Sequence, residues 1–258
     1  MLSLKEIKKF YPQSLHYAEE FLIREFLQYK LLEIVYESEL GQHLIFLGGT
    51  CLRLIHGNSR FSEDLDFDNK GLNKNDFTAV SELIRKGLEL EGYEVELKVV
   101  HKGAFHCYIR FPGLLFKQGL SGHQEQKILI QLDTEPQNYN YTPEKILLNK
   151  FDVFTEILST PLPTLLSQKF YAVLNRKRNK GRDFFDIVFL LSLQIEPDWK
   201  YLKQKAKISG KTDLKDAIIE HCGKIDMKEM ARDVEPFLFQ AKDSKKVIHF
   251  SQLIEQTY

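Results

Sequence analysis

The sequence predicts an α/β fold in its first half and a helical arrangement in its second half. Short apolar or alternating runs, typical of strands, are separated by helix-like segments up to about residue 142. After Pro143 the chain is rich in helix formers and shows few strand signals. The 258 residues, 43% of them hydrophobic, suffice for a substantial core. We therefore expect a core domain over residues 1–142 and a helical domain over residues 143–258.

Hydrophobic periodicity places the elements in order along the first half. Apolar residues recur at helical spacing over 15–38, and a short apolar strand follows at 43–47. We expect a short helix at 50–56, a strand at 64–68 and a helix at 75–91. The remaining expected strands are at 94–100, 104–111 and 127–133, with a glycine-rich loop at 113–122. A helix is expected after Pro161 and Pro163, running to about 179, and another at 182–193. Three or four short helices are expected in 198–258.

Composition limits the class of protein. The 36 basic and 36 acidic residues give no net charge, so the total does not indicate a strongly cationic nucleic-acid binder. The three cysteines are scattered and form no CxxC pair, which argues against a zinc site or a disulfide framework. No apolar run is long enough to span a bilayer, and the N-terminus lacks signal-peptide features. We expect a cytoplasmic protein without a membrane partner.

Asp64 and Asp66 form the main candidate for chemistry. Side chains two apart project from the same face of a strand, so the two carboxylates would lie together while Leu65 and Phe67 enter the core. A divalent cation would neutralise their repulsion, and oxygen ligands favour Mg²⁺ or Mn²⁺ over zinc. The simpler interpretation is a pair of surface acids in a turn. Asp68 continues the alternation, but its neighbours indicate a solvated strand end.

Two neighbouring features suit a phosphate-bearing ligand. Gly48 and Gly49 precede a predicted helix with Thr50 as a possible cap, and glycines let a ligand approach the backbone closely. Arg60 is available to a carboxylate or a phosphate. The glycine pair could equally be an ordinary turn, and neither the P-loop nor the dinucleotide pattern is present.

A third carboxylate, Asp133, ends an apolar predicted strand, where active sites of open α/β sheets often form. Beside the first two it would complete a two-metal site, whereas alone it is an ordinary strand-end acid. No histidine has a metal-ligand spacing such as HExxH.

The segment from Lys169 to Arg182 contains six basic residues and no acidic one. Such a segment facing an acidic pocket suits a phosphate-bearing substrate with its metal ions. Asp183 and Asp186 follow, three residues apart on one helix face. They could also simply pair with Arg182 or other nearby cations.

The run from Gly48-Gly49-Thr50 to Arg60-Phe-Ser-Glu-Asp64-Leu-Asp66-Phe closely resembles the first motif of the AbiEii/AbiGii toxin family. The later Lys169, Arg176 and Gly181-Arg-Asp-Phe-Phe-Asp186 resemble the downstream motifs of the same family. These proteins are nucleotidyltransferase-like toxins of toxin–antitoxin and abortive-infection systems. The resemblance implies a polymerase-β-like nucleotidyltransferase domain with a mixed sheet, followed by a helical domain.

The resemblance also implies transfer of a nucleoside monophosphate from an NTP to an acceptor, with Mg²⁺ or Mn²⁺ required. The acceptor that related toxins imply is the 3′ end of tRNA or another RNA. Asp64, Asp66 and Asp133 would bind the metal, and Lys169 would contact the triphosphate. Asp183 or Asp186 would be the downstream acid, and Gly48, Gly49, Thr50, Arg60 and Arg182 would help to bind nucleotide. A cognate antitoxin is an implied partner. A kinase, a phosphodiesterase and a non-catalytic relative that binds nucleotide or a partner are the alternatives.

Overall fold

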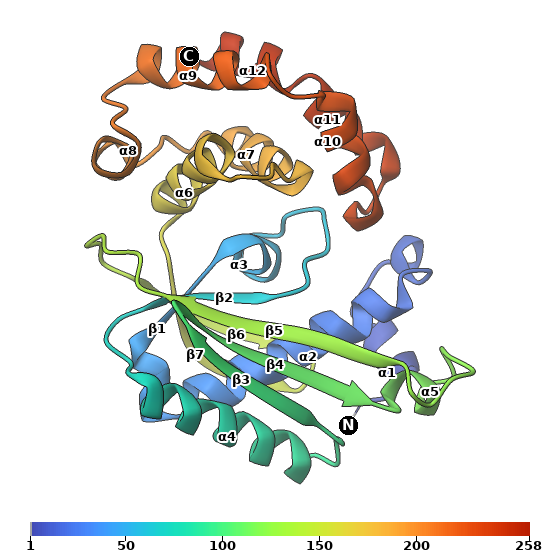
Figure 1. Ribbon diagram of the computed structural model, residues 1–258. Coiled ribbons are helices and arrows are strands. Elements are labelled where there is room, and N and C mark those ends of the chain that lie inside the picture. Colours follow the sequence, from blue (N-terminus) through green and yellow to red (C-terminus); the bar gives the residue numbers. More distant parts are fainter. Residues whose placement is uncertain (1) are drawn as a thin grey trace. The chain divides into compact units, whose positions relative to one another are not determined.

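The computed structural model describes residues 2–258. Within this range it contains one sheet with the strand order β3-β4-β5-β2-β1-β7-β6 (Figure 1). The strands are β1 (Leu44–Leu47), β2 (Leu65–Asn69), β3 (Glu96–Lys102), β4 (Ala104–Pro112), β5 (Lys127–Glu135), β6 (Glu144–Lys150) and β7 (Val153–Ser159).

The helices separate into those interleaved with the strands and those that follow them. The first group is α1 (Leu4–Lys8), α2 (Glu19–Tyr36), α3 (Gly48–Leu54), α4 (Lys74–Leu90) and α5 (Leu114–Lys117). The second group is α6 (Leu162–Asn175), α7 (Gly181–Ser192), α8 (Trp199–Ala206), α9 (Lys211–Cys222), α10 (Met227–Val234), α11 (Lys245–Ile248) and α12 (Phe250–Thr257). None of the helices in residues 2–258 has both the length and the apolar character that crossing a bilayer requires.

The described chain divides into two compact units. The first contains the chain up to Cys51 together with Phe61–Ser159, and the second contains Leu52–Arg60 together with Thr160–Tyr258. This division differs from the expected boundary at residue 142 in two respects. Residues 143–159 belong to the first unit, and a short segment before β2 belongs to the second.

The sheet of the first unit is mixed. β2 runs parallel to β5, and β1 runs parallel to β7, whereas the remaining neighbours are antiparallel. Helices α2 and α4 pack against each other and against the strands (Figure 1). On β2, the ring of Phe67 lies 6.5 Å from the ring of Tyr36 in α2. Because side chains alternate along a strand, Asp66 and Asp68 face away from this helix.

The hairpin of β6 and β7 corrects the expectation that the chain is helical after Pro143. Alternate residues of β7, namely Val153, Thr155 and Ile157, are buried, which is the pattern of a half-covered strand. β6 contains the helix formers Glu, Lys and Leu, so its composition favours a helix and does not predict a strand. Its pairing with β7, rather than local propensity, decides its structure.

In the second unit, α7 and α10 cross with no room for a side chain at Gly181. A Cβ atom on this residue would collide with the carbonyl oxygen of Met230 in α10. The Gly181 N–H donates to Asp233 Oδ2 at 2.8 Å, which satisfies one of the free donors at the start of α7. The expected break at Gly181 is thus a helix start that is fixed by close packing.

The segment 52–60 is attached to this second unit by several contacts. Arg60 forms a β-bridge with Leu238, and the Phe239 N–H donates to the Ser59 carbonyl at 3.2 Å. The guanidinium of Arg53 lies 4.5 Å from the centre of the Phe239 ring. These contacts explain why a loop between α3 and β2 folds with the C-terminal helices.

Candidate active site

Gly48 allows the end of β1 to turn directly into α3. Its φ of +81° is in the left-handed region, which glycine adopts without the cost that a side chain imposes. A Cβ atom here would collide with Asp66 Oδ2 and would stand 3.1 Å from the Cβ and Cγ atoms of Asp66. The absence of a side chain at Gly48 therefore makes the space in which the Asp66 carboxylate lies.

Asp64 immediately precedes β2, which begins at Leu65 and not at Asp64 as expected. Its position is fixed through the backbone. The Thr50 hydroxyl donates to the Asp64 carbonyl. From α2, the buried Gln28 amide donates to the Ser62 and Glu63 carbonyls at 3.1 and 2.9 Å. Thr50 thus connects α3 to the start of β2, and its hydroxyl is occupied by this role.

Asp133 lies opposite Asp66 in the register of β2 and β5. Neighbouring strands are about 4.8 Å apart and in-register side chains share a face, so these two carboxylates lie side by side. On its other side Asp133 is opposite His106 of β4, whose Nδ1 atom is 2.7 Å from Asp133 Oδ1. The Gln131 amide nitrogen is 2.8 Å from both Asp133 oxygens. The structure therefore brings Asp133 to Asp66, as the strand-end position predicts.

Asp68 has a different role from that expected. It is buried, whereas its sequence neighbours indicate a solvated position. Its carboxylate accepts the Gln137 N–H at 2.8 Å and the Tyr141 hydroxyl at 2.9 Å, and it pairs with Lys70 at 2.8 Å. These contacts hold the connection between β5 and β6, so its carboxylate is a structural group.

The carboxylates of the first unit fit a hard divalent cation. Asp64, Asp66 and Asp133 supply oxygen donors of the type that Mg²⁺ prefers, and Gly48 provides space beside Asp66. Within residues 2–258, no three acidic, histidine or cysteine side chains gather into a complete metal centre. Mg²⁺ is commonly bound through one or two carboxylates together with substrate phosphates, for which a complete protein cage is not required.

The second unit brings the other predicted residues into a buried ion-pair network. Arg60 binds Asp186 through two parallel contacts, Nε to Oδ1 at 2.7 Å and Nη2 to Oδ2 at 2.6 Å. The Lys169 ammonium is 2.8 Å from Asp186 Oδ2 and 2.8 Å from Asp183 Oδ1. Arg176 contacts Asp183 Oδ2 at 2.6 Å. Arg60 and Asp186 are 1% and 0% exposed, so this is a charged core.

The charges of this network shift the pKa values of its members. Burial alone raises the pKa of Asp186, but Arg60 and Lys169 outweigh burial and lower that pKa below its ordinary value. Burial likewise lowers the pKa of Lys169, but Asp183 and Asp186 outweigh it and raise that pKa. The network therefore favours the ionised forms of both residues.

These shifts predict the pH range over which the network stabilises the second unit. A lowered carboxyl pKa contributes stability that is complete above the unfolded value of about 3.9 and is lost as pH falls through the folded pKa. A raised lysine pKa contributes stability that is complete below about 10.4 and is lost as pH rises through the folded pKa. We expect these contributions to be constant from about pH 4.5 to 10, and an Asp186→Asn variant to lose part of the acid-side dependence in urea titrations. An unchanged acid-side slope in that variant would contradict this prediction.

Arg182 and Asn58 complete the description of this unit. The Arg182 guanidinium lies 4.4 Å from the centre of the Phe237 ring, which is a cation–π contact. The buried Asn58 donates from Nδ2 to Asp186 Oδ1 at 2.8 Å.

Three residues with roles near these sites were not predicted from the sequence, namely Asn58, Gln28 and His106. Gln28 could have been identified as a polar residue within the apolar face of α2. No feature of the sequence pattern pointed to Asn58 or His106.

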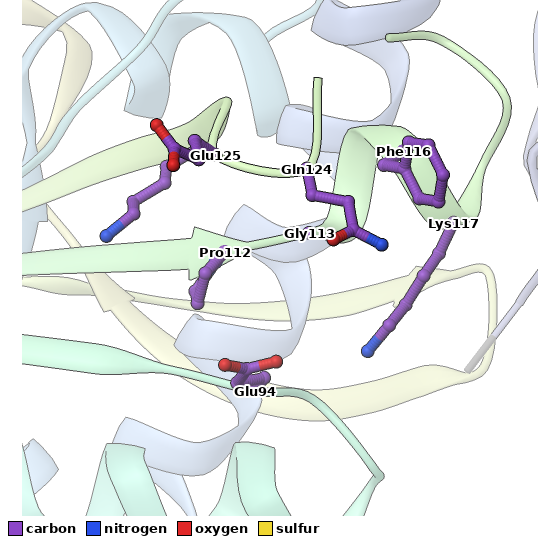
Figure 2. Close-up of a pocket in the computed structure, with 8 residues that line it drawn as sticks. Glu94, Pro112, Gly113, Phe116, Lys117, Gln124 and Glu125 are labelled. Atoms are coloured by element: carbon purple, nitrogen blue, oxygen red, sulfur yellow. The ribbon is translucent and has the colours of Figure 1, made fainter. Parts of the chain in front are cut away.

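A cavity of about 720 Å³ lies in the first unit (Figure 2). Phe116 and Lys117 of α5 line it together with Gln124 and Glu125 of the loop before β5. It is next to Lys127 at the start of β5, whereas Asp133 is near the end of that strand. The cavity contains none of the predicted site residues.

The mixed sheet with paired acidic residues beside a glycine turn is the arrangement of a nucleotidyltransferase fold. Comparison with protein families supports this directly. Residues 30–254 match the model of the family described as nucleotidyl transferase AbiEii toxin, type IV TA system. The chain belongs to this AbiEii nucleotidyltransferase toxin family, which confirms the predicted resemblance and fold class.

Solved structures show the same fold. The crystal structure of JHP933 from Helicobacter pylori matches with a TM-score of 0.55 and 16% identity, over 92% of this chain and 93% of that chain. A structure from H. pylori provisionally described as a nucleotidyltransferase matches with a TM-score of 0.55 and 16% identity, over 91% and 94%. Comparison with curated proteins found no match.

Proposed function

We propose that this protein transfers a nucleoside monophosphate from an NTP to the 3′ end of an RNA, with tRNA as the expected acceptor, and requires Mg²⁺ or Mn²⁺. The observation that carries the proposal is the placement of Asp66 between Gly48 and Asp133, with Asp64 two residues earlier. Family membership supports the nucleotidyl transfer and a cognate antitoxin as partner.

In this mechanism Asp66 and Asp133, with Asp64 beside them, would supply carboxylate oxygens to a cation whose remaining ligands are substrate phosphate oxygens. When bound, the cation would neutralise phosphate charge and favour in-line attack of the acceptor hydroxyl oxygen on the α-phosphorus. The bond from the α-phosphorus to the bridging oxygen breaks in the same step, and pyrophosphate is released. Gly48 keeps the Asp66 carboxylate in place, and Thr50 and Gln28 fix the backbone of the segment around Asp64. Holding the reacting groups in place accounts for much of the acceleration in phosphoryl transfer.

Exposed cations support a polyanionic acceptor. Lys177, Arg178 and Lys180 are exposed in the loop between α6 and α7. Lysine and arginine on a surface release counterions from a nucleic acid backbone and so contribute to binding. The contact of Lys169 with the triphosphate stays a prediction, because its ammonium is shared by Asp183 and Asp186.

The experiment incubates the full-length protein with each of four α-³²P-labelled NTPs, MgCl₂ or MnCl₂, and total RNA. We expect labelled RNA with at least one NTP, and no label on RNA whose 3′ end has been oxidised with periodate. EDTA should abolish labelling. Label transferred from a γ-³²P-labelled NTP alone would indicate a kinase, and no labelling under any condition would overturn the proposal.

A Gly48→Ala substitution should disturb the site without removing any functional group. The added methyl group would displace the Asp66 carboxylate, and a positive φ costs alanine about 1 kcal/mol. A displacement near 1 Å can reduce catalysis by about 10²-fold. We expect this loss in labelling rate with a small loss in thermal stability. Gly57→Ala is the control, since its φ of +76° is similar and no atom lies within 4 Å of the added Cβ. Equal labelling by both variants would contradict the prediction.

A further inference from the structure

The contact between His106 and Asp133 is not accounted for by the family resemblance or by the proposed function. Both side chains are partly exposed, with 26% and 28% of their areas accessible. They project from neighbouring strands at in-register positions, and their atoms are 2.7 Å apart. A hydrogen bond of this length between a ring nitrogen and a carboxylate is strong and directional.

The geometry fixes which atom donates. A carboxylate accepts hydrogen bonds, so the His106 Nδ1 atom carries the proton and donates to Asp133 Oδ1. The Gln131 amide donates to both oxygens at 2.8 Å from the same strand and face. Two donors thereby fix the rotation of the Asp133 side chain. A carboxylate oxygen can accept more than one contact, so Asp133 Oδ2, which accepts from Gln131, retains acceptor capacity.

Asp133 has Asp66 as its register neighbour on the side opposite His106. A carboxylate beside another carboxylate would turn away to reduce repulsion unless other groups held it. His106 supplies this restraint from the side opposite Asp66, and Gln131 supplies it from the same strand as Asp133. Groups that fix the orientation of a metal-binding carboxylate typically change metal affinity by about 10–100-fold when they are removed.

We infer that His106 is a positioning residue that holds the Asp133 carboxylate beside Asp66 for binding of a divalent cation. This inference rests on the proposed function, because it assumes that Asp133 takes part in cation binding. It adds a role for the Nδ1–H group of His106, which acts through Asp133 and does not itself contact the cation.

The test measures Mn²⁺ affinity of the full-length protein by electron paramagnetic resonance, without nucleotide or RNA. We expect His106→Leu to raise the Kd for Mn²⁺ by about 10-fold or more, because the donor is lost. The amide nitrogen of asparagine occupies nearly the position of histidine Nδ1, so His106→Asn should stay within about 3-fold of the wild type. An unchanged Kd in His106→Leu, or an equal loss in both variants, would overturn the inference.

Controls separate this effect from misfolding and from failure of the proposed function. His123→Leu removes an exposed imidazole from the loop before β5 and should leave the Kd unchanged. If His106→Leu does not fold, Gln131→Leu tests the same restraint and should also weaken binding. Nucleotide labelling by the wild type, combined with unaltered Mn²⁺ affinity in both variants, would reject the inference while leaving the proposed function standing.

Discussion

An Asp66→Asn variant is expected to lose nucleotide transfer by at least about a thousandfold. The substitution preserves the size of the side chain but replaces a charged oxygen beside Gly48 with an amide. Charge stabilisation by a bound cation amounts to several kcal/mol of the reaction barrier, and about 4 kcal/mol corresponds to a thousandfold in rate. The measurement is the initial rate of α-³²P labelling at saturating NTP and metal.

Asp68→Asn is the matched control for this variant, because it lies on the same strand and face two residues later. Its carboxylate holds the Gln137 N–H and the Tyr141 hydroxyl, so its loss should lower stability by about 1–3 kcal/mol while transfer continues. If a fully folded Asp66→Asn variant transferred nucleotide at a near-normal rate, the Asp66 carboxylate would not be needed for transfer, and the proposed function would lose its main support.

An Arg60→Met variant is expected to destabilise the second unit by about 3–5 kcal/mol. The substitution leaves the fully buried Asp186 carboxylate without its bidentate guanidinium partner. Removing one partner of a buried ion pair typically lowers the free energy of unfolding by about 3–5 kcal/mol. Because Lys169 and Asn58 still contact Asp186, we expect the loss of stability to lie toward the lower end of this range. Urea unfolding followed by circular dichroism measures the change.

The exposed pair of Lys211 and Glu196 provides a comparison within the same unit. Its side chains are 52% and 59% exposed, and Lys211→Met should cost less than about 1 kcal/mol. An Arg60→Met/Asp186→Leu double variant should recover part of the loss, because no uncompensated charge remains at that position. If Arg60→Met unfolds like the wild type, the network contributes little stability.

Most of the helices and the first five strands could be predicted from hydrophobic periodicity. The prediction for 75–91 corresponds to α4, and that for 127–133 to β5, within one or two residues at each end. The hairpin of β6 and β7 could not be predicted, because Lys145, Leu147 and similar residues favour helices locally. Only pairing with β1, which is more than 100 residues earlier in the chain, makes these segments part of the sheet.

The candidate site was predictable where it depends on alternation along one strand. Asp64 immediately precedes β2 and Asp66 lies within it, and Asp133 is level with Asp66 because β5 runs parallel beside β2. The partner of Arg60 was not predictable, since a guanidinium suits a carboxylate and a phosphate equally. Only the fold shows that Asp186, 126 residues later, is that carboxylate.

That separation along the chain has a consequence for synthesis. Arg60 leaves the ribosome 126 residues ahead of the carboxylate that neutralises it. At 5–20 residues per second, the interval is roughly 6–25 s. Throughout this interval the loop carrying Asn58 and Arg60 lacks its native contacts with Asp186. A chain terminated before Asp186 would keep Asp64 and Asp66 yet lack these contacts permanently, so this part of the second unit can form only after Asp186 has been synthesised.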